Sequence, residues 1–139
     1  MRIQRQQILE RSGGAPQLWA VVDEAVLRRP IGGQDVMRAQ IAALIEASER
    51  PNVRLQIIPF HAGGHAAAGG SFAIFRFPEP ELPDVVWVEH LTSSIYLDKR
   101  EDVDHYAIAM ERVCIDAEPP DRTRVILEKL MNEVGRSAT

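Results

Sequence analysis

The sequence predicts an α+β fold, in which a βαβ unit is extended by an antiparallel meander into a five-stranded mixed sheet flanked by helices. Three observations predict it. Residues 18–58 read as strand, helix and strand, which is the order of a right-handed βαβ unit. Residues 72–97 hold three short strand signals with brief connections between them. Residues 103–134 hold two amphipathic helical patterns separated by two prolines.

The first half of the chain supplies the βαβ unit. A short helix is expected over residues 2–11, and Ser-Gly-Gly at 12–14 ends it. The run LWAVVDEAVL, residues 18–27, begins with a strand that should end near Asp23 and Glu24. Because this strand is apolar on both faces, we expect a central strand covered on both sides. RRPIGG, residues 28–33, predicts a turn. A helix over 35–49, whose apolar face includes Met37 and Ile41, leads to a second strand from Val53.

The second half supplies the meander and the closing helices. Strands are expected at residues 72–77, 85–89 and 94–97, where β-branched and aromatic residues gather. The first closing helix has an apolar stripe from Val103 to Ala117. The second can be capped by Asp121 and is stopped by Gly135.

Composition limits the class of protein. The chain has 139 residues, 45% of them apolar and 26% charged, which is typical of one globular domain spanning 1–139. Its net charge of −4 disfavours direct nucleic-acid binding, because such binding depends on cations that neutralise phosphates. The single cysteine, Cys114, permits no internal disulfide, and no apolar run is long enough for a signal peptide or a membrane span. We therefore expect a cytoplasmic protein that binds no membrane.

The segment HAGGHAAAGG, residues 61–70, is the most unusual part of the sequence. Its glycines allow the backbone to approach a ligand closely, and it follows a strand, where binding loops usually lie. It lacks the Lys-Ser/Thr pair of a phosphate-binding loop. His61 and His65 are four residues apart, but a flexible loop does not fix them for zinc, so no metal is expected. A structural loop and a ligand-contacting loop both remain open.

Two carboxylates complete the candidate site. Glu24 and Glu89 each follow an apolar strand, and buried carboxylates need a partner. If their strands are neighbours, both could converge with His65, and Tyr96 could place its hydroxyl in the same cleft. The alternative is that Glu24 and Glu89 form ordinary ion pairs with nearby arginines, namely Arg28, Arg54 or Arg76. Trp19 and Trp87 are expected in the core or at a pocket wall.

No covalent or cofactor chemistry is indicated. There is no nucleophile elbow, no nucleotide fingerprint and no activating neighbourhood around Cys114, so no cofactor is expected. If the chain is an enzyme, its catalytic residues are unassigned. The candidates are His65 or His61 as general base and Glu24 or Glu89 as the orienting or acidic group.

Five segments in order resemble a known family. They are RQQIL, LWAVVDEAVLRRPIGG, VMRAQIAALIE, PNVRLQIIPFHAGGHAAAGGSFAIFRFP and DVVWVEHLTSSIYLDKREDVDHY. Together they resemble the domain of unknown function that follows an Xre-type helix-turn-helix in actinobacterial transcriptional regulators of the WhiJ-like kind. The likeness runs from about Arg2 to about Ala117. The helix-turn-helix itself is not in this sequence, and neither is the linker that usually comes before the RQQIL helix.

The resemblance implies a sensing or partner-binding role without established chemistry. Positions that match the family pattern are Glu24, Gly32, Met37, Gln40, Pro59, Gly64, His65, Phe72, Glu89 and Tyr96. His61 departs from the small polar residue expected there. The ligand-binding candidates are therefore Glu24, Gln40, His61, His65, Glu89 and Tyr96.

Three hypotheses follow. The first is an effector domain that binds a small molecule or a small partner protein in a cleft near the Gly/His loop. The second is a stand-alone enzyme recruited to a natural-product biosynthetic pathway, using His/Glu acid–base chemistry in the same cleft. The third is a structural or oligomerising domain. A homodimer is left open.

Overall fold

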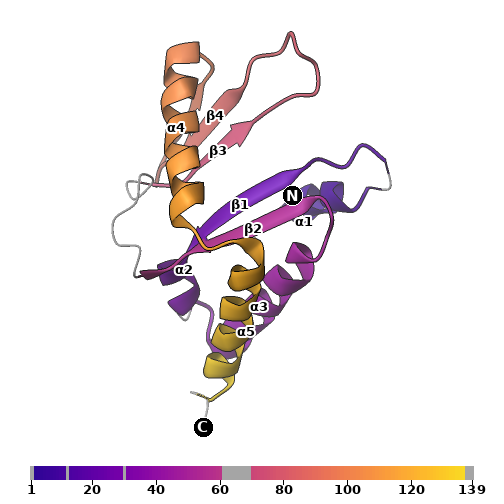
Figure 1. Cartoon of the computed structure of the whole chain (residues 1–139), viewed down its shortest axis with the longest axis vertical. Helices are drawn as coiled ribbons and strands as arrows, with labels where there is room; N and C mark the ends of the chain where they lie inside the picture. The colour runs from indigo at the N-terminus through magenta and orange to yellow at the C-terminus, as the bar shows by residue number, and fades with distance from the viewer. Residues whose placement is uncertain (1, 12, 30, 61–69, 137–139) are drawn as a thin grey trace. The chain divides into compact units, whose positions relative to one another are not determined.

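The computed structural model describes residues 2–11, 13–29, 31–60 and 70–136. Within them it has five α-helices, one short 3-10 turn and two small sheets, so the α+β class is confirmed (Figure 1). The chain divides into two compact units. Unit 1 comprises Met1–His61 and Ala117–Thr139, and unit 2 comprises Ala62–Asp116. No helix in the described ranges is both long and apolar enough to cross a membrane.

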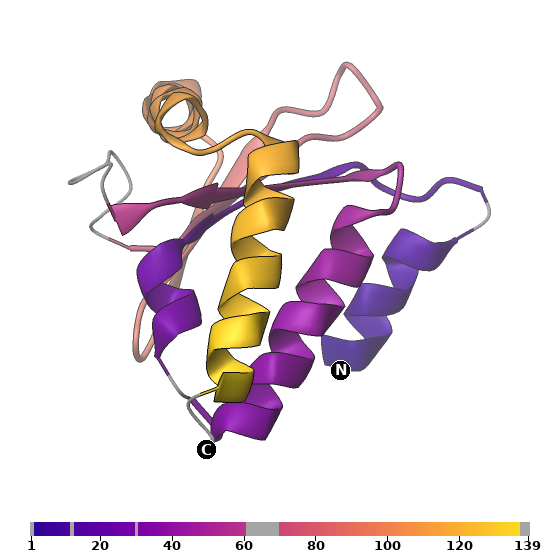
Figure 2. The same ribbon diagram turned by 60° about the horizontal axis from the view of Figure 1, so that its bottom comes forward.

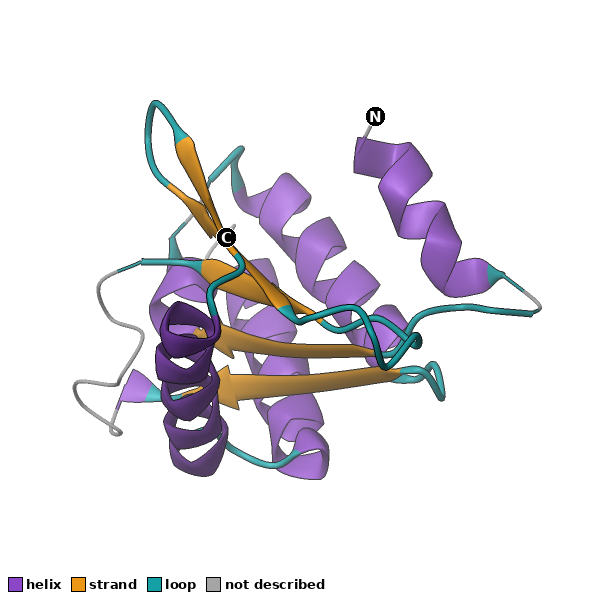
Figure 3. Ribbon diagram, turned by 90° about the horizontal axis from the view of Figure 1, so that it is seen from above, coloured by secondary structure: helices purple, strands orange, loops and turns teal. Residues whose placement is uncertain are grey.

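Unit 1 is built on a pair of parallel strands. β1 (Leu18–Asp23) and β2 (Val53–Ile58) pair with Leu18 opposite Val53 and Asp23 opposite Ile58, so both strands end at the same level. Their arrows point the same way in Figure 3. Two helices connect them, α2 (Glu24–Arg28) and α3 (Gln34–Ser48). The predicted strand–helix–strand order is confirmed, with the additional short helix α2 where the sequence suggested the end of an apolar run.

Two helices cover one face of this strand pair. α3 and α5 (Pro120–Arg136) lie side by side beneath β1 and β2 (Figure 2). Alternation along the strands turns every second side chain toward these helices. The buried core that results consists of Leu27, Ile41, Leu55, Ile57, Leu127 and Leu130.

The outer edge of β2 is closed by the segment that leads into α5. The Ile57 N–H donates to the Thr123 hydroxyl over 3.0 Å, and the Ile57 carbonyl accepts from the Glu118 N–H over 2.8 Å. Gln56 adds a second link, because its amide nitrogen donates to the Glu118 carbonyl and its amide oxygen accepts from the Trp19 ring N–H. Thr123 and Ile57 are fully buried. The backbone groups of Ile57 are therefore satisfied without a third strand.

The structure corrects two expectations about the sheet. The five strands do not form one mixed sheet, since two parallel strands and three antiparallel strands make separate sheets. One physical reason is that hydrogen bonds from Glu118 and Thr123 already occupy the backbone groups of Ile57 at the edge of β2. A further strand cannot pair with β2 at that position. β1 is also not a central strand, because it pairs only with β2 in the part of the chain described. Trp19 at its start is half exposed rather than in the core.

Unit 2 contains the predicted meander. β3 (Phe72–Phe75), β4 (Val85–Glu89) and β5 (Ser94–Leu97) form an antiparallel sheet in that order, with β3 two residues shorter than predicted. One face packs on α4 (Arg100–Asp116). The Phe72 and Tyr106 rings meet edge to face with centroids 5.0 Å apart. The inward residues are Phe72, Ile74, Val86, Val88, Leu97, Val103 and Tyr106.

The N-terminal segment is a broken helix. Residues 2–11, expected as one helix, form α1 (Arg2–Gln6) followed by the 3-10 turn η1 (Gln7–Glu10). Asn52, just before β2, holds the segment by donating to the Leu9 carbonyl over 3.1 Å. Arg50 also pairs with Glu10 over 2.7 Å.

Candidate functional site

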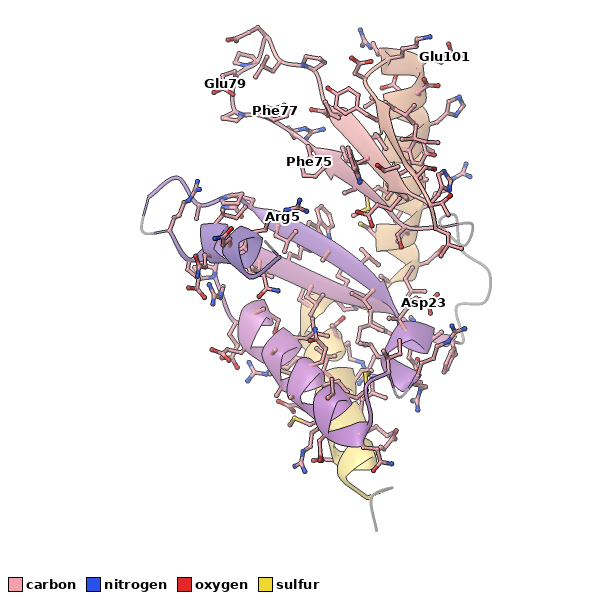
Figure 4. All side chains as sticks on the ribbon, turned by 180° about the vertical axis from the view of Figure 1, so that it is seen from behind. Arg5, Asp23, Phe75, Phe77, Glu79 and Glu101 are labelled. Atoms are coloured by element: carbon pink, nitrogen blue, oxygen red, sulfur yellow. The ribbon has the colours of Figure 1, made fainter. Side chains whose placement is uncertain are left out.

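The carboxyl ends of β1 and β2 form the first candidate site. Asp23 and Ile58 stand opposite each other there, and the chain turns at once from β1 into α2 (Figure 4). The turn is stabilised by Asp23, whose Oδ1 accepts a 2.9 Å hydrogen bond from the Ala25 N–H as the N-cap of α2. In open α/β sheets, ligands bind outside the carboxyl ends of the strands where the strand order reverses, so the same edge of this two-stranded pair is a candidate site.

Glu24 is the central side chain at this edge. It is only 7% exposed, and both its carboxylate oxygens accept hydrogen bonds. Oε1 accepts from the Phe60 N–H over 3.1 Å, and Oε2 accepts from the Arg28 Nε over 2.5 Å. Glu24 therefore joins α2 to the residue at which the chain enters segment 61–69.

Arg28 extends this connection to α5. Its Nη1 lies 3.3 Å from a Glu133 carboxylate oxygen, and its guanidinium carbon lies 5.5 Å from the centre of the Phe60 ring. The hydrogen bond to Glu24 raises the pKa of Arg28 despite partial desolvation, so Arg28 stays cationic at every ordinary pH. The ion pair of Glu24 with Arg28, one of the alternatives from the sequence, is present.

A hollow of about 340 Å³ adjoins this network. Its floor is apolar and its rim is polar, with two arginines. This volume falls in the lower range of small-molecule sites. The residues that line it are Leu27, Arg28, Arg29, Gln34, Met37, Leu130, Glu133 and Val134.

A second hollow, of about 460 Å³, lies at the opposite end of the strands. Arg50, Pro51 and Asn52 line one side of it, and Leu9, Glu10 and Arg11 line another. It is the seam where the N-terminal segment is attached by the Asn52 and Arg50 bonds. We therefore regard it as part of that attachment.

Unit 2 brings together Glu89 and Tyr96, two of the ligand-binding candidates predicted from the sequence. In the register of the sheet Trp87 stands between Ala73 and Tyr96, and alternation puts these residues on the face away from α4. The same alternation adds Phe75, Glu89, Ser94 and the buried Val85. We call the subset Ala73, Phe75, Trp87, Glu89 and Tyr96 the aromatic face.

The aromatic rings of this face are open to solvent. Phe75 is 50% exposed, Trp87 37% and Tyr96 58%. The Trp87 ring N–H donates to Glu89 Oε1 over 3.3 Å, so the carboxylate lies against the edge of the indole. Trp87 was expected in the core or at a pocket wall, and its exposure on an open face is a correction.

The sequence-predicted residues thus fall into three groups. Glu24 and Gln40 belong to unit 1, where Glu24 is buried at the carboxyl edge and Gln40 is exposed on α3. Glu89 and Tyr96 belong to unit 2 and share the aromatic face. His61 and His65 lie outside the described residues. The convergence of Glu24, His65 and Glu89 in one cleft stays a prediction.

Several site residues were not singled out from the sequence. Glu133 was missed because its role depends on a tertiary contact, and Phe60 because its backbone N–H carries the bond, whereas Arg28 was expected only as an alternative ion-pair partner of Glu24. Arg28 had a local signal, since it stands four residues after Glu24 and such pairs meet on a helix. Nothing local marks Glu133, which is 105 residues from Arg28 in sequence.

The comparison with protein families returns one model. A family described as "Domain of unknown function (DUF5753)" matches residues 1–129. No curated protein and no solved structure matches the chain.

Proposed function

Because the chain belongs to the DUF5753 family of domains, which the family description leaves without a function, we propose from its own geometry that it is a sensing domain. It binds a small molecule in the hollow beside Arg28, which residues of α2, α3 and α5 line. The resemblance of the sequence to the effector regions of Xre-type actinobacterial regulators supports the same role.

One observation carries the proposal. Arg28 at the rim of the hollow, together with the buried Glu24 carboxylate, connects three segments: α2, the Phe60 backbone, and Glu133 of α5. A ligand that touches Arg28 would change the balance of these bonds. Occupation of the hollow would therefore alter how Phe60 and α5 are held, which is what a sensor requires.

The lining indicates the class of ligand. Leu27, Met37 and Leu130 form an apolar floor, and each is at least nine-tenths buried. Arg28 is already engaged by two glutamates, whereas the Arg29 side chain at the rim has no hydrogen-bond or ion-pair partner among the described residues, and the residue is exposed. An apolar molecule with one anionic group matches this arrangement, with its anion on Arg29.

A thermal-shift screen of anionic, neutral and cationic amphipathic metabolites tests this proposal. We expect only the anionic class to raise the melting temperature, and a ligand at one hundred times its Kd adds about 2.7 kcal/mol of stability. Arg29→Gln should weaken binding of the hit about tenfold, by loss of a charge-assisted hydrogen bond. Arg38→Gln, which removes an equal charge from α3 outside the hollow, is the matched control.

The same experiment separates the sensing role from catalysis. A sensor returns its ligand chemically unchanged after prolonged incubation, whereas conversion of the hit would favour the acid–base enzyme. If no class shifts the melting temperature, or if Arg29→Gln and Arg38→Gln behave alike, the proposed site is wrong.

A further inference from the structure

The two units differ in charge. In unit 2, residues 62–116, there are ten Asp and Glu side chains and four Lys and Arg side chains, giving a formal charge of −6. Unit 1 has twelve Lys and Arg side chains against ten acidic ones, giving +2. The acidity of the protein therefore resides entirely in the unit that carries the aromatic face.

Acidic residues lie on and around the aromatic face itself. Glu89 is on it, and Asp98 follows Tyr96 by two residues and is exposed. Glu79 and Glu81 lie in the connection between β3 and β4. Figure 4 shows Glu79 farther along this connection than Phe75 and Phe77. Asp84 is different, because it is held by Arg76 in an ion pair of 3.0 Å.

We propose that the aromatic face binds an arginine-rich segment of a partner protein. A guanidinium group stacks on an indole or phenol ring and donates to a neighbouring carboxylate at the same time. Trp87 and Glu89 offer this combination at hydrogen-bond distance from each other. Tyr96, opposite Trp87 on the neighbouring strand β5, offers a second ring. In the described chain the second oxygen of Glu89 has no protein donor.

The negative charge of unit 2 decides which class of molecule can bind to the aromatic face. Nucleic acids and anionic membrane surfaces are repelled by a unit whose formal charge is −6 and whose aromatic face carries Glu89 with Asp98, Glu79 and Glu81 nearby. A second copy of the same face would bring two such surfaces together, so symmetric self-association is disfavoured as well. A basic polypeptide is attracted, and the exposed rings give it an apolar contact. The proposal does not depend on the small-molecule site in unit 1, and either can fail alone.

The experiment is a calorimetric titration of the full chain with three eight-residue peptides, alternating Arg-Ser, Lys-Ser and Glu-Ser. We expect the Arg peptide to bind most tightly, the Lys peptide more weakly because it lacks a planar cation, and the Glu peptide not at all. Added salt should weaken binding of the Arg peptide. Equal affinity for the Arg and Lys peptides, or no binding of either, would overturn the proposal.

Variants separate this face from general attraction to an acidic protein. Trp87→Ala and Tyr96→Ala should each weaken the Arg peptide about two- to fivefold, and Glu89→Gln about twofold or more. Glu111→Gln removes the same charge from the exposed side of α4, and it should leave the affinity unchanged. Should Glu89→Gln and Glu111→Gln have equal effects, the attraction is not specific to this face. Circular dichroism of each variant confirms folding, and the half-exposed Tyr96 gives a readout if Trp87→Ala does not fold.

Discussion

Replacing Thr123 by valine tests whether its hydroxyl closes the edge of β2. The two side chains have nearly the same shape, so the change removes the hydroxyl without opening a cavity. Thr123 is fully buried, and its oxygen is the acceptor for the Ile57 N–H at 3.0 Å. The Glu118 carbonyl loses a longer bond of 3.3 Å but keeps the Gln56 donor. The main loss is therefore a single acceptor for a buried amide.

The magnitude follows from that loss. A buried N–H left without an acceptor costs about 1–3 kcal/mol, so we expect Thr123→Val to lower the free energy of unfolding by about 2 kcal/mol. Thr123→Ser keeps the hydroxyl and removes one buried methyl group, which costs about 1 kcal/mol. The expected order of stability is threonine, then serine, then valine.

Urea unfolding measures this order. In a Trp87→Phe background the fluorescence reports on Trp19, which belongs to unit 1 and is bonded to Gln56 in the same network. Amide exchange at Ile57 should accelerate in the valine variant relative to the serine variant. A valine variant as stable as the wild type, or more stable, would refute the conclusion that the Thr123 hydroxyl closes the edge of β2 by accepting from the Ile57 N–H.

Three further substitutions test the described contacts by the same unfolding assay. Asp23→Ala removes the N-cap of α2 and should cost about 1 kcal/mol, whereas Asp23→Asn should retain most of that stability. Glu24→Ala deprives the Phe60 N–H and Arg28 of their acceptor and should cost about 2–3 kcal/mol, while Glu24→Gln keeps the first bond and costs less. Arg124→Ala breaks half-exposed ion pairs with Glu49 and Glu128, and it should change stability by less than about 1 kcal/mol. A loss above 2 kcal/mol at Arg124, or none at Glu24, would contradict the burial that the structure shows.

Much of the secondary structure could be predicted because it is encoded locally. The bounds of β4 and β5 agree with those expected, since β-branched and aromatic runs end at turn residues. α3 was expected one residue later at each end, from the spacing of Met37 and Ile41. α2 was missed because its apolar residues continue the apolar run of β1. Asp23, in the N-cap position, was the local signal that the strand becomes a helix there.

The division into two sheets could not be predicted from local patterns. It depends partly on the bonds of Ile57 to Thr123 and Glu118, which lie more than sixty residues away in sequence. The candidate site shows the same limit. The need of a buried Glu24 for a partner followed from residue type, and Arg28 was among the expected partners, but Phe60 as a second partner is a tertiary contact. Glu89 and Tyr96 were expected in one cleft with Glu24 and His65, which stays a prediction, and the register of β4 and β5 places the two on one face of unit 2.

Unit 1 takes its strands from the beginning of the chain and α5 from the other side of unit 2. During synthesis on the ribosome, β1, β2 and α3 emerge first, and Leu127 and Leu130 reach them only after unit 2 has been made. Until then the nascent chain presents an uncovered apolar surface, for which a chaperone is the natural temporary partner. Unit 2 is continuous in sequence and is free to fold earlier. We therefore expect messages truncated before α5 to yield products that proteases remove, so that cells accumulate only chains that contain this helix.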